Sequence, residues 1–553
     1  MPVIELSLAG LKARTRNRVS NDQILSALPF IGLDIESQTE ETVSVEYSPN
    51  RPDFSSEAGI ARSLVGLLGI ETGLQKYSFA QSQIQVSVEG TEIQNVRPYI
   101  FALQASLNVT DQVIKQLIVM QEDLHNGLGR RRSKVAIGIH NAEIVRPPIK
   151  YLATNDRSYS FVPLGSTTKK TIGQILIETE QGKEYSRLLN RGLFPLLIDS
   201  SGNTLSMPPI INGELTRLKE GVKRIFVDVT STDLRAGETT IAIIASMLSD
   251  TGARIESVKI DYEGRTGEFT PNMMPNSMKF DLDLTNEILG LDLTLDDARL
   301  ALEKSRLELM SNNLAKVPRY RSDIIHPVDL VEEVAIGYGI SNLKPQKIKS
   351  SLVGSVSNRT KKSSMIADIL VGLDLTEIQN LSLTGEKELA IQEQTSFKVE
   401  DPKSSNYEFL RSEALPSVLY VLGQSTHEEY PQRVFEKVSV FKKSNLTETR
   451  SFEEEHIAVA IASSTSKFTE IRSVLDAFLR LALAEGSEVQ IVALKEKQMI
   501  FAEGRTAKIV LVNNKQKIEI GRIGEVAPNV LAKTGIQVPV CAFELNLEPF
   551  LKD

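Results

Sequence analysis

The sequence lacks tryptophan and has a single cysteine, Cys541, in 553 residues. One cysteine cannot form a disulfide within the chain, which fits a reducing compartment. No run approaches the ~18 apolar residues of a membrane-spanning helix, and the first residues lack the apolar region of a secretory signal. We therefore expect a cytoplasmic protein without a membrane partner.

An excess of positive charge is also missing, because 63 basic residues stand against 71 acidic ones and the net charge is −8. Such a chain does not coat nucleic acid non-specifically, so any RNA contact must come from a local basic patch. The sequence contains no P-loop, no Rossmann glycine fingerprint, no HExxH and no G-x-S-x-G. Its five histidines are scattered without zinc-ligand spacing, so each is more simply explained as structural.

Hydrophobic periodicity predicts an α+β chain of several domains. We expect a small N-terminal α/β unit at residues 1–80 and a larger mixed α/β domain at 85–265. A small domain with an acidic helix follows at 270–345, and a strand-rich domain with helices occupies 346–553.

The acidic helix begins in the stretch VPRYRSDIIHPVDLVEEVAIGYG, which carries Asp323, Asp329, Glu332 and Glu333. Pro327 suits the first turn of a helix. The last three acids then fall at i, i+3 and i+4, which predicts one shared face. A hard cation would offset their repulsion, and Mg²⁺ is typically held by a few carboxylates and waters. Acids in first helical turns also commonly just face solvent, and spacing alone favours that interpretation.

Two further segments are candidate sites. The loop LHNGLGRRRSK carries Arg130, Arg131, Arg132 and Lys134, four basic residues in five positions. It is the best candidate for a phosphate-backbone contact, although a solvated basic loop is more frequent.

The second is the proline-containing segment LSMPPIING, where Ser206 and Asn212 flank an apolar stretch. This pattern suits a pocket with a few polar anchors, and equally a proline-stiffened hairpin edge. Residues 224–232 are predicted to form a strand, with Asp228 within it and Asp233 just after it.

Seven segments together resemble one known family, the phenylalanyl-tRNA synthetase β subunits of the archaeal and eukaryotic type. They occur in the family's order and span nearly the whole chain. They read EYSPNRPD with SEAGIARSLVGLLGIETGL, LHNGLGRRRSKVAIGIHN, LIDSSGNTLSMPPIINGE, VPRYRSDIIHPVDLVEEVAIGYG, PQRVFEKV, FTEIRSVLDAFL and IGRIGEVAPNVLAKTGI.

The resemblance implies a phenylalanine-tRNA ligase, which joins phenylalanine to its tRNA through an adenylate, with ATP and Mg²⁺. It implies an α₂β₂ heterotetramer with an α subunit and tRNA-Phe as partners. The 346–553 domain would resemble a class II synthetase domain without activity. IGRIGEV lacks the arginine of a late class II motif, and Arg411-Ser412-Glu413 matches the earlier arginine motif only superficially. Adenylation is therefore expected in the α subunit, with no catalytic residue for it here.

By the same resemblance, residues 85–265 form an editing domain that hydrolyses mischarged tyrosyl-tRNA. Leu197, Ser206 and Asn212 would line its pocket, and either Asp228 or Asp233 would help to orient water. The basic run would guide the acceptor end of the tRNA, and the acidic quartet would bind Mg²⁺ near the α subunit. The alternative function is a freestanding or non-catalytic tRNA-binding protein that keeps the fold but not the editing activity.

Overall fold

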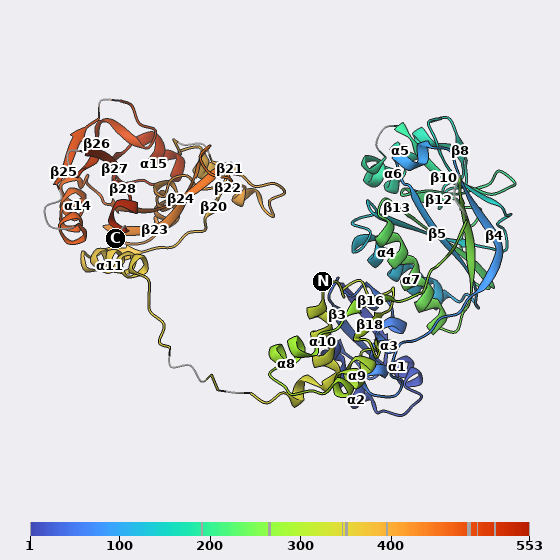
Figure 1. Cartoon of the computed structure of the whole chain (residues 1–553). Helices are drawn as coiled ribbons and strands as arrows, with labels where there is room; N and C mark the ends of the chain where they lie inside the picture. The colour runs from blue at the N-terminus through green and yellow to red at the C-terminus, as the bar shows by residue number, and fades with distance from the viewer. Residues whose placement is uncertain are drawn as a thin grey trace. The chain divides into compact units, whose positions relative to one another are not determined.

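The computed structural model describes residues 2–189, 192–263, 267–345, 347–348, 352–393, 396–483, 488–494, 496–513 and 516–551. The chain forms two compact units, Met1–Lys347 and Ile348–Asp553 (Figure 1). Residues 265 and 346, where two of the predicted domain boundaries fall, lie outside the described residues. Across those described residues, no helix is both long enough and apolar enough to cross a bilayer.

The first unit begins with an antiparallel sheet of order β1-β3-β2 and three helices. Helix α3 starts after Ser56, whose side chain accepts a hydrogen bond from the N–H of Gly59. Its apolar residues at helical spacing, such as Ile60 and Leu64, are buried against the sheet. These elements are β1 (Val3–Ser7), α1 (Leu8–Arg14), α2 (Asn21–Ala27), β2 (Leu33–Gln38), β3 (Thr42–Tyr47) and α3 (Glu57–Leu67).

A large mixed sheet follows, with strand order β12-β11-β10-β7-β4-β14-β5-β13-β6 and β15 paired to β14. Strand β4 runs parallel to β7 and β14, and the other pairs are antiparallel. The strands are β4 (Ala80–Glu89), β5 (Tyr99–Ser106), β6 (Val135–Asn141), β7 (Ile149–Thr154), β10 (Phe194–Ile198), β11 (Thr204–Met207), β12 (Ile211–Asn212), β13 (Arg224–Ser231), β14 (Arg254–Tyr262) and β15 (Glu268–Thr270).

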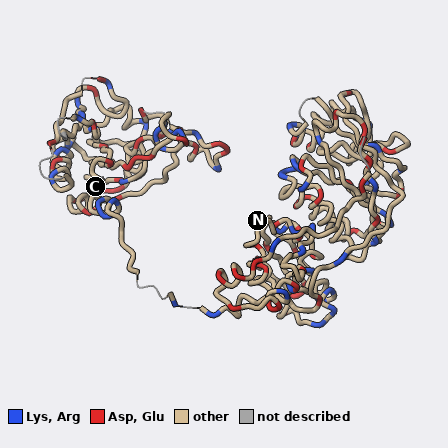
Figure 2. Tube along the Cα trace, viewed as in Figure 1, with Lys and Arg blue, Asp and Glu red and all other residues tan. Residues whose placement is uncertain are grey.

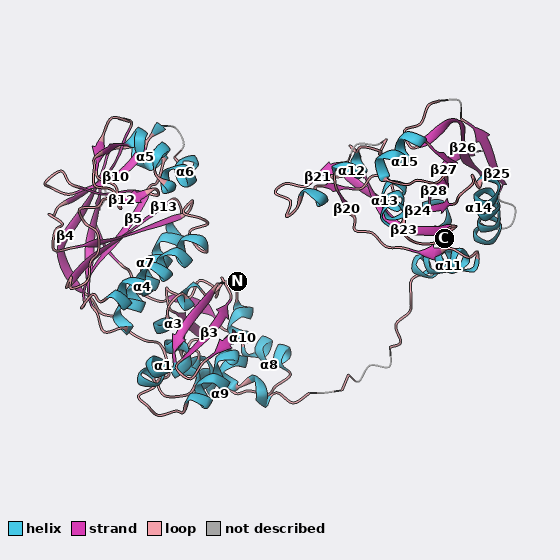
Figure 3. Cartoon of the chain, turned by 180° about the vertical axis from the view of Figure 1, so that it is seen from behind, coloured by secondary structure: helices cyan, strands magenta, loops and turns pink. Residues whose placement is uncertain are grey.

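Helices α4 (Asp111–Asn126) and α7 (Leu234–Asp250) pack on one face of this sheet (Figure 3). Strand β13 shows why its residues divide between the two faces. Val227 and Val229 join the core beneath these helices, whereas Phe226 belongs to the core on the opposite face. Because side chains alternate along a strand, Asp228 lies on the face of Phe226, away from α7.

A small subdomain covers the β10–β12 end of the sheet. Its core joins Phe161, Ile172 and Ile175 to Phe194 and Met207 of the sheet. Its elements are β8 (Ser160–Phe161), β9 (Lys170–Thr171), α5 (Ile172–Glu178) and α6 (Glu180–Tyr185).

The last part of the first unit is an antiparallel sheet of order β16-β18-β17 with three helices. Helix α10 begins at Pro327, as the sequence predicts, and Asp329 completes a capping box with His326. Leu330 and Val334 of α10 are buried against α9. The elements are β16 (Asn276–Lys279), α8 (Leu282–Leu289), α9 (Leu295–Lys304), β17 (Glu308–Leu309), β18 (Leu314–Val317) and α10 (Pro327–Tyr338).

The second unit is built on a sheet of order β19-β23-β24-β28-β27-β26-β25, antiparallel except for the β19–β23 pair. Its strands are β19 (Thr376–Glu377), β23 (Gln432–Lys443), β24 (Ser451–Ala462), β25 (Glu488–Ala493), β26 (Phe501–Asn513), β27 (Gln516–Val526) and β28 (Val540–Asn546).

Helices cover both faces of this sheet. The core on one face includes α11 (Asn358–Gly372), α14 (Phe468–Ala482) and α16 (Glu548–Leu551), and the core on the other includes α13 (Leu415–Gln424) and α15 (Pro528–Thr534). A minor sheet has the order β20 (Leu383–Thr384), β22 (Phe409–Leu410) and β21 (Phe397–Lys398), and the short helix α12 (Glu386–Leu389) lies beside it. The resemblance implies a class II synthetase-like antiparallel sheet with helices for this part of the chain, and the multidomain α+β fold class is confirmed.

Candidate functional site

A cavity of about 290 Å³ lies where the two edge strands of the large sheet, β6 and β12, approach each other. Helix α4, the basic loop, the β11–β12 hairpin and strand β13 also line it, together with Leu164 and with Gln181 of α6. Four of the predicted site residues line it: Arg132, Ser206, Asn212 and Asp228. We call this space the β6–β12 cavity.

Three of the predicted pocket residues form one row across neighbouring strands. Leu197 pairs with Ser206, and Ser206 pairs with Asn212, so their side chains share a face of the sheet. The Ser206 hydroxyl is buried and has no hydrogen-bond partner among the described residues. An unpaired buried hydroxyl costs about 1–3 kcal/mol, so it suits a ligand in the cavity. Leu197, at one end of this row, is fully buried in the core and does not line the cavity.

The structure distinguishes the two candidate acids. Asp228 lines the cavity, and its Oδ1 lies 2.9 Å from Nε2 of His140, with both side chains buried. Asp233 instead caps helix α7, accepting a hydrogen bond from the N–H of Ala236, and pairs with Lys134 at 3.0 Å. Asp233 does not line the β6–β12 cavity.

The basic loop divides its side chains between the cavity and solvent. Arg130, Arg131 and Arg132 all have left-handed backbone angles, with φ of 45°, 52° and 63°. This conformation is costly for residues other than glycine and is concentrated at functional sites. Arg130 and Arg131 are exposed. Arg132 turns inward, donating to the carbonyl of Ile210 at 3.2 Å and to Glu122 at 3.0 Å.

Buried Arg97 holds this loop against strand β13. Its guanidinium donates to the carbonyl of Arg132 and to both the hydroxyl and the carbonyl of Thr230. Burial lowers the pKa of Arg97 to about 10, so it remains charged at neutral pH. The loop conformation is therefore fixed by contacts from residues distant in the sequence.

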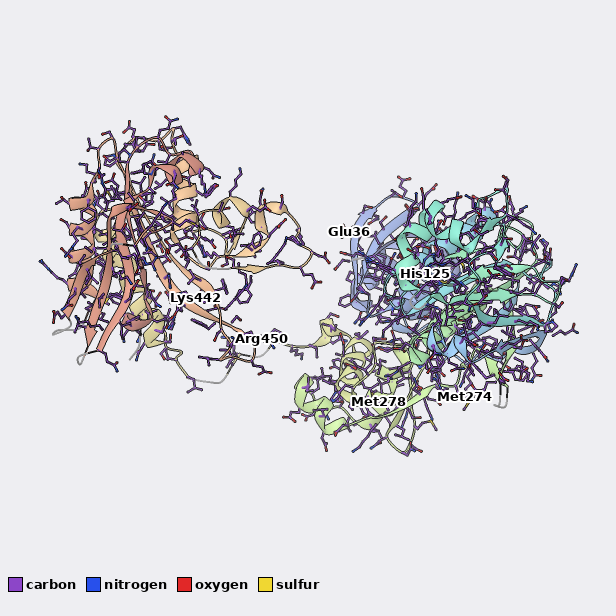
Figure 4. The ribbon with its side chains drawn as sticks, turned by 90° about the horizontal axis from the view of Figure 1, so that it is seen from above. Glu36, His125, Met274, Met278, Lys442 and Arg450 are labelled. Carbon is purple, nitrogen blue, oxygen red and sulfur yellow. The ribbon has the colours of Figure 1, made fainter. Side chains whose placement is uncertain are left out.

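The sequence did not single out Glu122 and His125 of α4, which also line the cavity (Figure 4 labels His125). His125 Nε2 accepts the N–H of Ile137 at 2.9 Å, so its Nδ1 carries the proton and faces Glu122. Burial lowers the pKa of His125, which keeps the ring neutral. The hydrogen bond from His125, together with the charge of Arg132, lowers the pKa of Glu122 to about 2. The i, i+3 spacing of these two residues on a helix was the available signal.

The acidic quartet is not gathered into one cluster. Asp323 and Glu333 are both paired with the buried guanidinium of Arg321, with Nε to Oδ1 of Asp323 at 2.9 Å. Asp329 accepts the N–H groups of Ile325 and His326 at 2.8 and 2.7 Å. Helix α10 places Asp329, Glu332 and Glu333 at i, i+3 and i+4, but Glu332 is exposed while Glu333 is buried, so the three carboxylates do not face solvent together.

The ligand set for a metal is incomplete in this chain by itself. Among the described residues, no three acidic, histidine or cysteine side chains are grouped so as to hold a metal ion. Arg321 already forms ion pairs with two of the four predicted carboxylates. The quartet as folded here does not fit Mg²⁺ without further ligands or rearrangement.

A wider cavity of about 880 Å³ connects two of the predicted sites. Arg130 and Lys134 of the basic loop line it, and so do Asp323 and Asp329 of the acidic stretch. Basic and acidic residues are interspersed along the trace of both units (Figure 2). The basic loop and the acidic stretch, almost 200 residues apart in sequence, thus border one groove.

The second unit has a pocket of about 240 Å³ whose lining is unsuited to a triphosphate. Its carboxylates include Glu393, Glu413, Glu519 and Glu544, and two of its basic side chains, Lys442 and Arg522, are paired with carboxylates (Figure 4 labels Lys442). Clustered carboxylates repel an anionic ligand.

Arg411, the one match to a class II arginine motif, is buried and pairs with Glu436 at 3.1 Å. It does not line the pocket. The described residues therefore offer no arginine pair free to bind ATP phosphates there.

Comparison with known proteins agrees with this architecture. The family model described as the phenylalanyl tRNA synthetase beta chain CLM domain matches residues 345–547, and that of the tRNA synthetase B5 domain matches residues 278–340. The phenylalanine–tRNA ligase β subunit of Archaeoglobus fulgidus is 38% identical, over 100% of this chain and 99% of the relative. The chain belongs to the phenylalanine–tRNA ligase β subunit family.

Other members are similarly close. The β subunit of Methanosphaera stadtmanae is 34% identical over 99% of both chains. The β subunit of Pyrococcus furiosus is 35% identical over the full length of both. A solved N-terminal fragment of the Pyrococcus horikoshii β subunit superimposes with a TM-score of 0.58 at 32% identity, covering 61% of this chain and 99% of the fragment. The resemblance carried by the seven segments is confirmed, and the protein is an aminoacyl-tRNA synthetase component.

Proposed function

We propose that this β subunit hydrolyses mischarged tyrosyl-tRNA in the β6–β12 cavity, while aminoacylation takes place in a separate α subunit of an α₂β₂ complex. The buried hydroxyl of Ser206, which has no hydrogen-bond partner in the described part of the chain, lies beside Asn212 and lines the same cavity as Asp228, and it carries this proposal. A buried polar atom without a partner in the folded chain is what a site for a polar ligand requires.

The need for such a site follows from the two amino acids. Tyrosine exceeds phenylalanine by one hydroxyl, and an apolar pocket rejects an added hydroxyl poorly. A second pocket that hydrogen-bonds this hydroxyl selects the wrong product for destruction. The β6–β12 cavity has apolar lining from Ile118, Ile210 and Ile211 and polar groups from Ser206 and Asn212, which suits a phenol side chain.

Hydrolysis at this site is assigned to water, because the chain's one cysteine, Cys541, is buried in the second unit. Water adds to the ester carbonyl carbon, and the bond between that carbon and the ribose oxygen breaks. Asp228 accepts the proton of the water, which then passes to the ribose oxygen. Arg132 has a buried Nε–H without a partner among the described residues, and this donor is available to the developing oxyanion.

The tRNA is assigned to the exposed side of the basic loop and the wider cavity. Arg130 and Arg131 are exposed, whereas Arg132 and Lys134 are tied to Glu122 and Asp233. The first two are therefore the better candidates for phosphate contacts. A double Arg130→Glu and Arg131→Glu variant is expected to weaken tyrosyl-tRNA deacylation more than adenylate formation, and equal loss of both activities would contradict this assignment.

Mg²⁺ and ATP are assigned to the complex. ATP is the substrate of the α subunit, and Mg²⁺ supplies charge neutralisation to phosphates or carboxylates. The acidic quartet remains our proposed Mg²⁺ site at the α-subunit boundary, with exposed Glu332 and ligands from the partner completing it.

The test is to coexpress the chain with a candidate α subunit and to measure both phenylalanine charging and tyrosyl-tRNA hydrolysis. Asp228→Asn and Ser206→Ala should reduce hydrolysis by about tenfold or more, with charging retained. Asp233→Ala, by contrast, should remove a helix cap and the pair with Lys134, lowering stability by about 1 kcal/mol without reducing hydrolysis. A stable chain that binds tRNA but never hydrolyses tyrosyl-tRNA would support the alternative of a non-catalytic tRNA-binding protein.

A further inference from the structure

We propose that His140 and Thr216 position the Asp228 carboxylate, so that a buried hydrogen-bonded chain of three residues prepares the editing site. This inference rests on the proposed editing function. It is carried by two contacts: His140 Nε2 lies 2.9 Å from Oδ1 of Asp228, and His140 Nδ1 lies 2.8 Å from Oγ1 of Thr216.

The three residues come from separate parts of the first unit. His140 is near the end of β6, Thr216 follows β12, and Asp228 is in the middle of β13. In the β13–β6 register Asp228 lies opposite Gly138, two residues before His140 on the same face. The Asp228 side chain passes over Gly138 to reach His140. Only glycine leaves room for it, since a Cβ at Gly138 would lie 2.3 Å from Oδ1 of Asp228.

The hydrogen-bonding capacity of the groups fixes their roles. An ionised carboxylate only accepts, so Nε2 of His140 must carry a proton and donate it to Asp228. In a neutral imidazole Nδ1 is then the acceptor, and the Thr216 hydroxyl donates to it. All three side chains are almost completely buried, so no bulk water competes for these bonds.

The surroundings make this geometry specific. The His140 ring lies next to Phe226, with ring centroids 6.3 Å apart, which restricts its rotation. The backbone carbonyl of Thr216 accepts the N–H of Asn141, which joins the segment after β12 to the end of β6. One oxygen of Asp228 is thus held by His140 while the residue lines the β6–β12 cavity. His140 and Thr216 do not line the cavity and act through Asp228.

The experiment measures tyrosyl-tRNA deacylation by the full complex with variants at both positions. His140→Met removes the donor at nearly constant size and should lower kcat by about 10- to 100-fold, with little change in KM. His140→Gln keeps an N–H donor and should restore most of the rate. Thr216→Val should lower kcat by about 3- to 10-fold, whereas Thr216→Ser, which keeps the hydroxyl, should match the wild type.

The outcomes separate this inference from the function on which it rests. A wild-type complex that does not deacylate tyrosyl-tRNA overturns the editing function itself. A wild-type complex that deacylates, with His140→Met or Thr216→Val equally active, overturns only the positioning role. If His140→Met fails to fold, the Thr216 pair decides. A loss of kcat in Thr216→Val that Thr216→Ser does not share, with equal melting temperatures, supports the inference.

Discussion

Replacing Gly138 by alanine should separate Asp228 from His140 and slow the tyrosyl-tRNA hydrolysis that we propose for the β6–β12 cavity. The new Cβ would lie 2.3 Å from Oδ1 of Asp228 and 2.7 Å from Nε2 of His140. Neither neighbour is a flexible chain end in solvent, because both are buried. The carboxylate must therefore move, and its hydrogen bond to the imidazole is lost.

Two terms set the size of the effect. Overpacking a well-filled site costs about 1–3 kcal/mol, and losing a hydrogen bond to a charged group costs about 1.5–3 kcal/mol. Their sum predicts a loss of about 2.5–6 kcal/mol in the stability of the first unit. If only the loss of this hydrogen bond raises the activation free energy of hydrolysis, kcat falls by about 10- to 150-fold.

The assay is tyrosyl-tRNA deacylation at 25 °C, with thermal melting in parallel. Gly173→Ala in α5 is the matched control, because its Cβ would meet atoms at 3.8 and 3.9 Å, ordinary contact distances. That variant should deacylate normally and be no less stable. Wild-type deacylation by a folded Gly138→Ala chain would refute the assignment of Asp228 to the reaction.

Four further predictions concern charged groups elsewhere. Glu333→Gln breaks a buried pair with Arg321 and should lower the stability of the first unit by about 3–5 kcal/mol. Glu332→Gln is exposed and should leave melting unchanged while weakening any Mg²⁺ dependence of assembly with the α subunit; unaltered Mg²⁺ dependence would remove it from the metal site. Arg411→Met should destabilise the second unit by about 3–5 kcal/mol, seen as an earlier melting transition, and leave tyrosyl-tRNA deacylation intact. Burial, with the nearby carboxylates, raises the pKa of Glu413 from 4.5 to about 7. Between pH 4.5 and about 7 the folded state therefore binds more protons than the unfolded state, and the stability of the second unit falls as pH rises through this range. Glu413→Gln should remove this fall in stability. At pH 8 the variant should be more stable than the wild type by about 1–3 kcal/mol and should melt at a higher temperature. A variant with the same pH dependence of melting as the wild type would contradict this prediction.

Local sequence patterns were enough to predict most of the helices and strands and to identify the family. Alternating and helical periodicities marked most of the long strands and helices, and Pro327 marked the start of α10 where the structure has it. These signals lie within a few residues of the features they predict. The alternation of side chains along β13 could also be read from the sequence. It places Asp228 on the same face of the sheet as Phe226 and on the opposite face from Val227 and Val229.

Only the tertiary structure decided which charges meet. The sequence predicted that the acids of α10 share one face, but it could not show that Arg321 forms ion pairs with both Asp323 and Glu333 while Glu332 is exposed. It likewise predicted one basic run, in which the fold directs only Arg132 into the cavity.

The proposed editing site shows the same limit. Asp228 and His140 are 88 residues apart, and they meet because two strands pair with Gly138 between them. Periodicity reports how a side chain points relative to its own helix or strand. It carries no information on which distant side chain it meets, because register and sheet closure are set by the packing of the whole core.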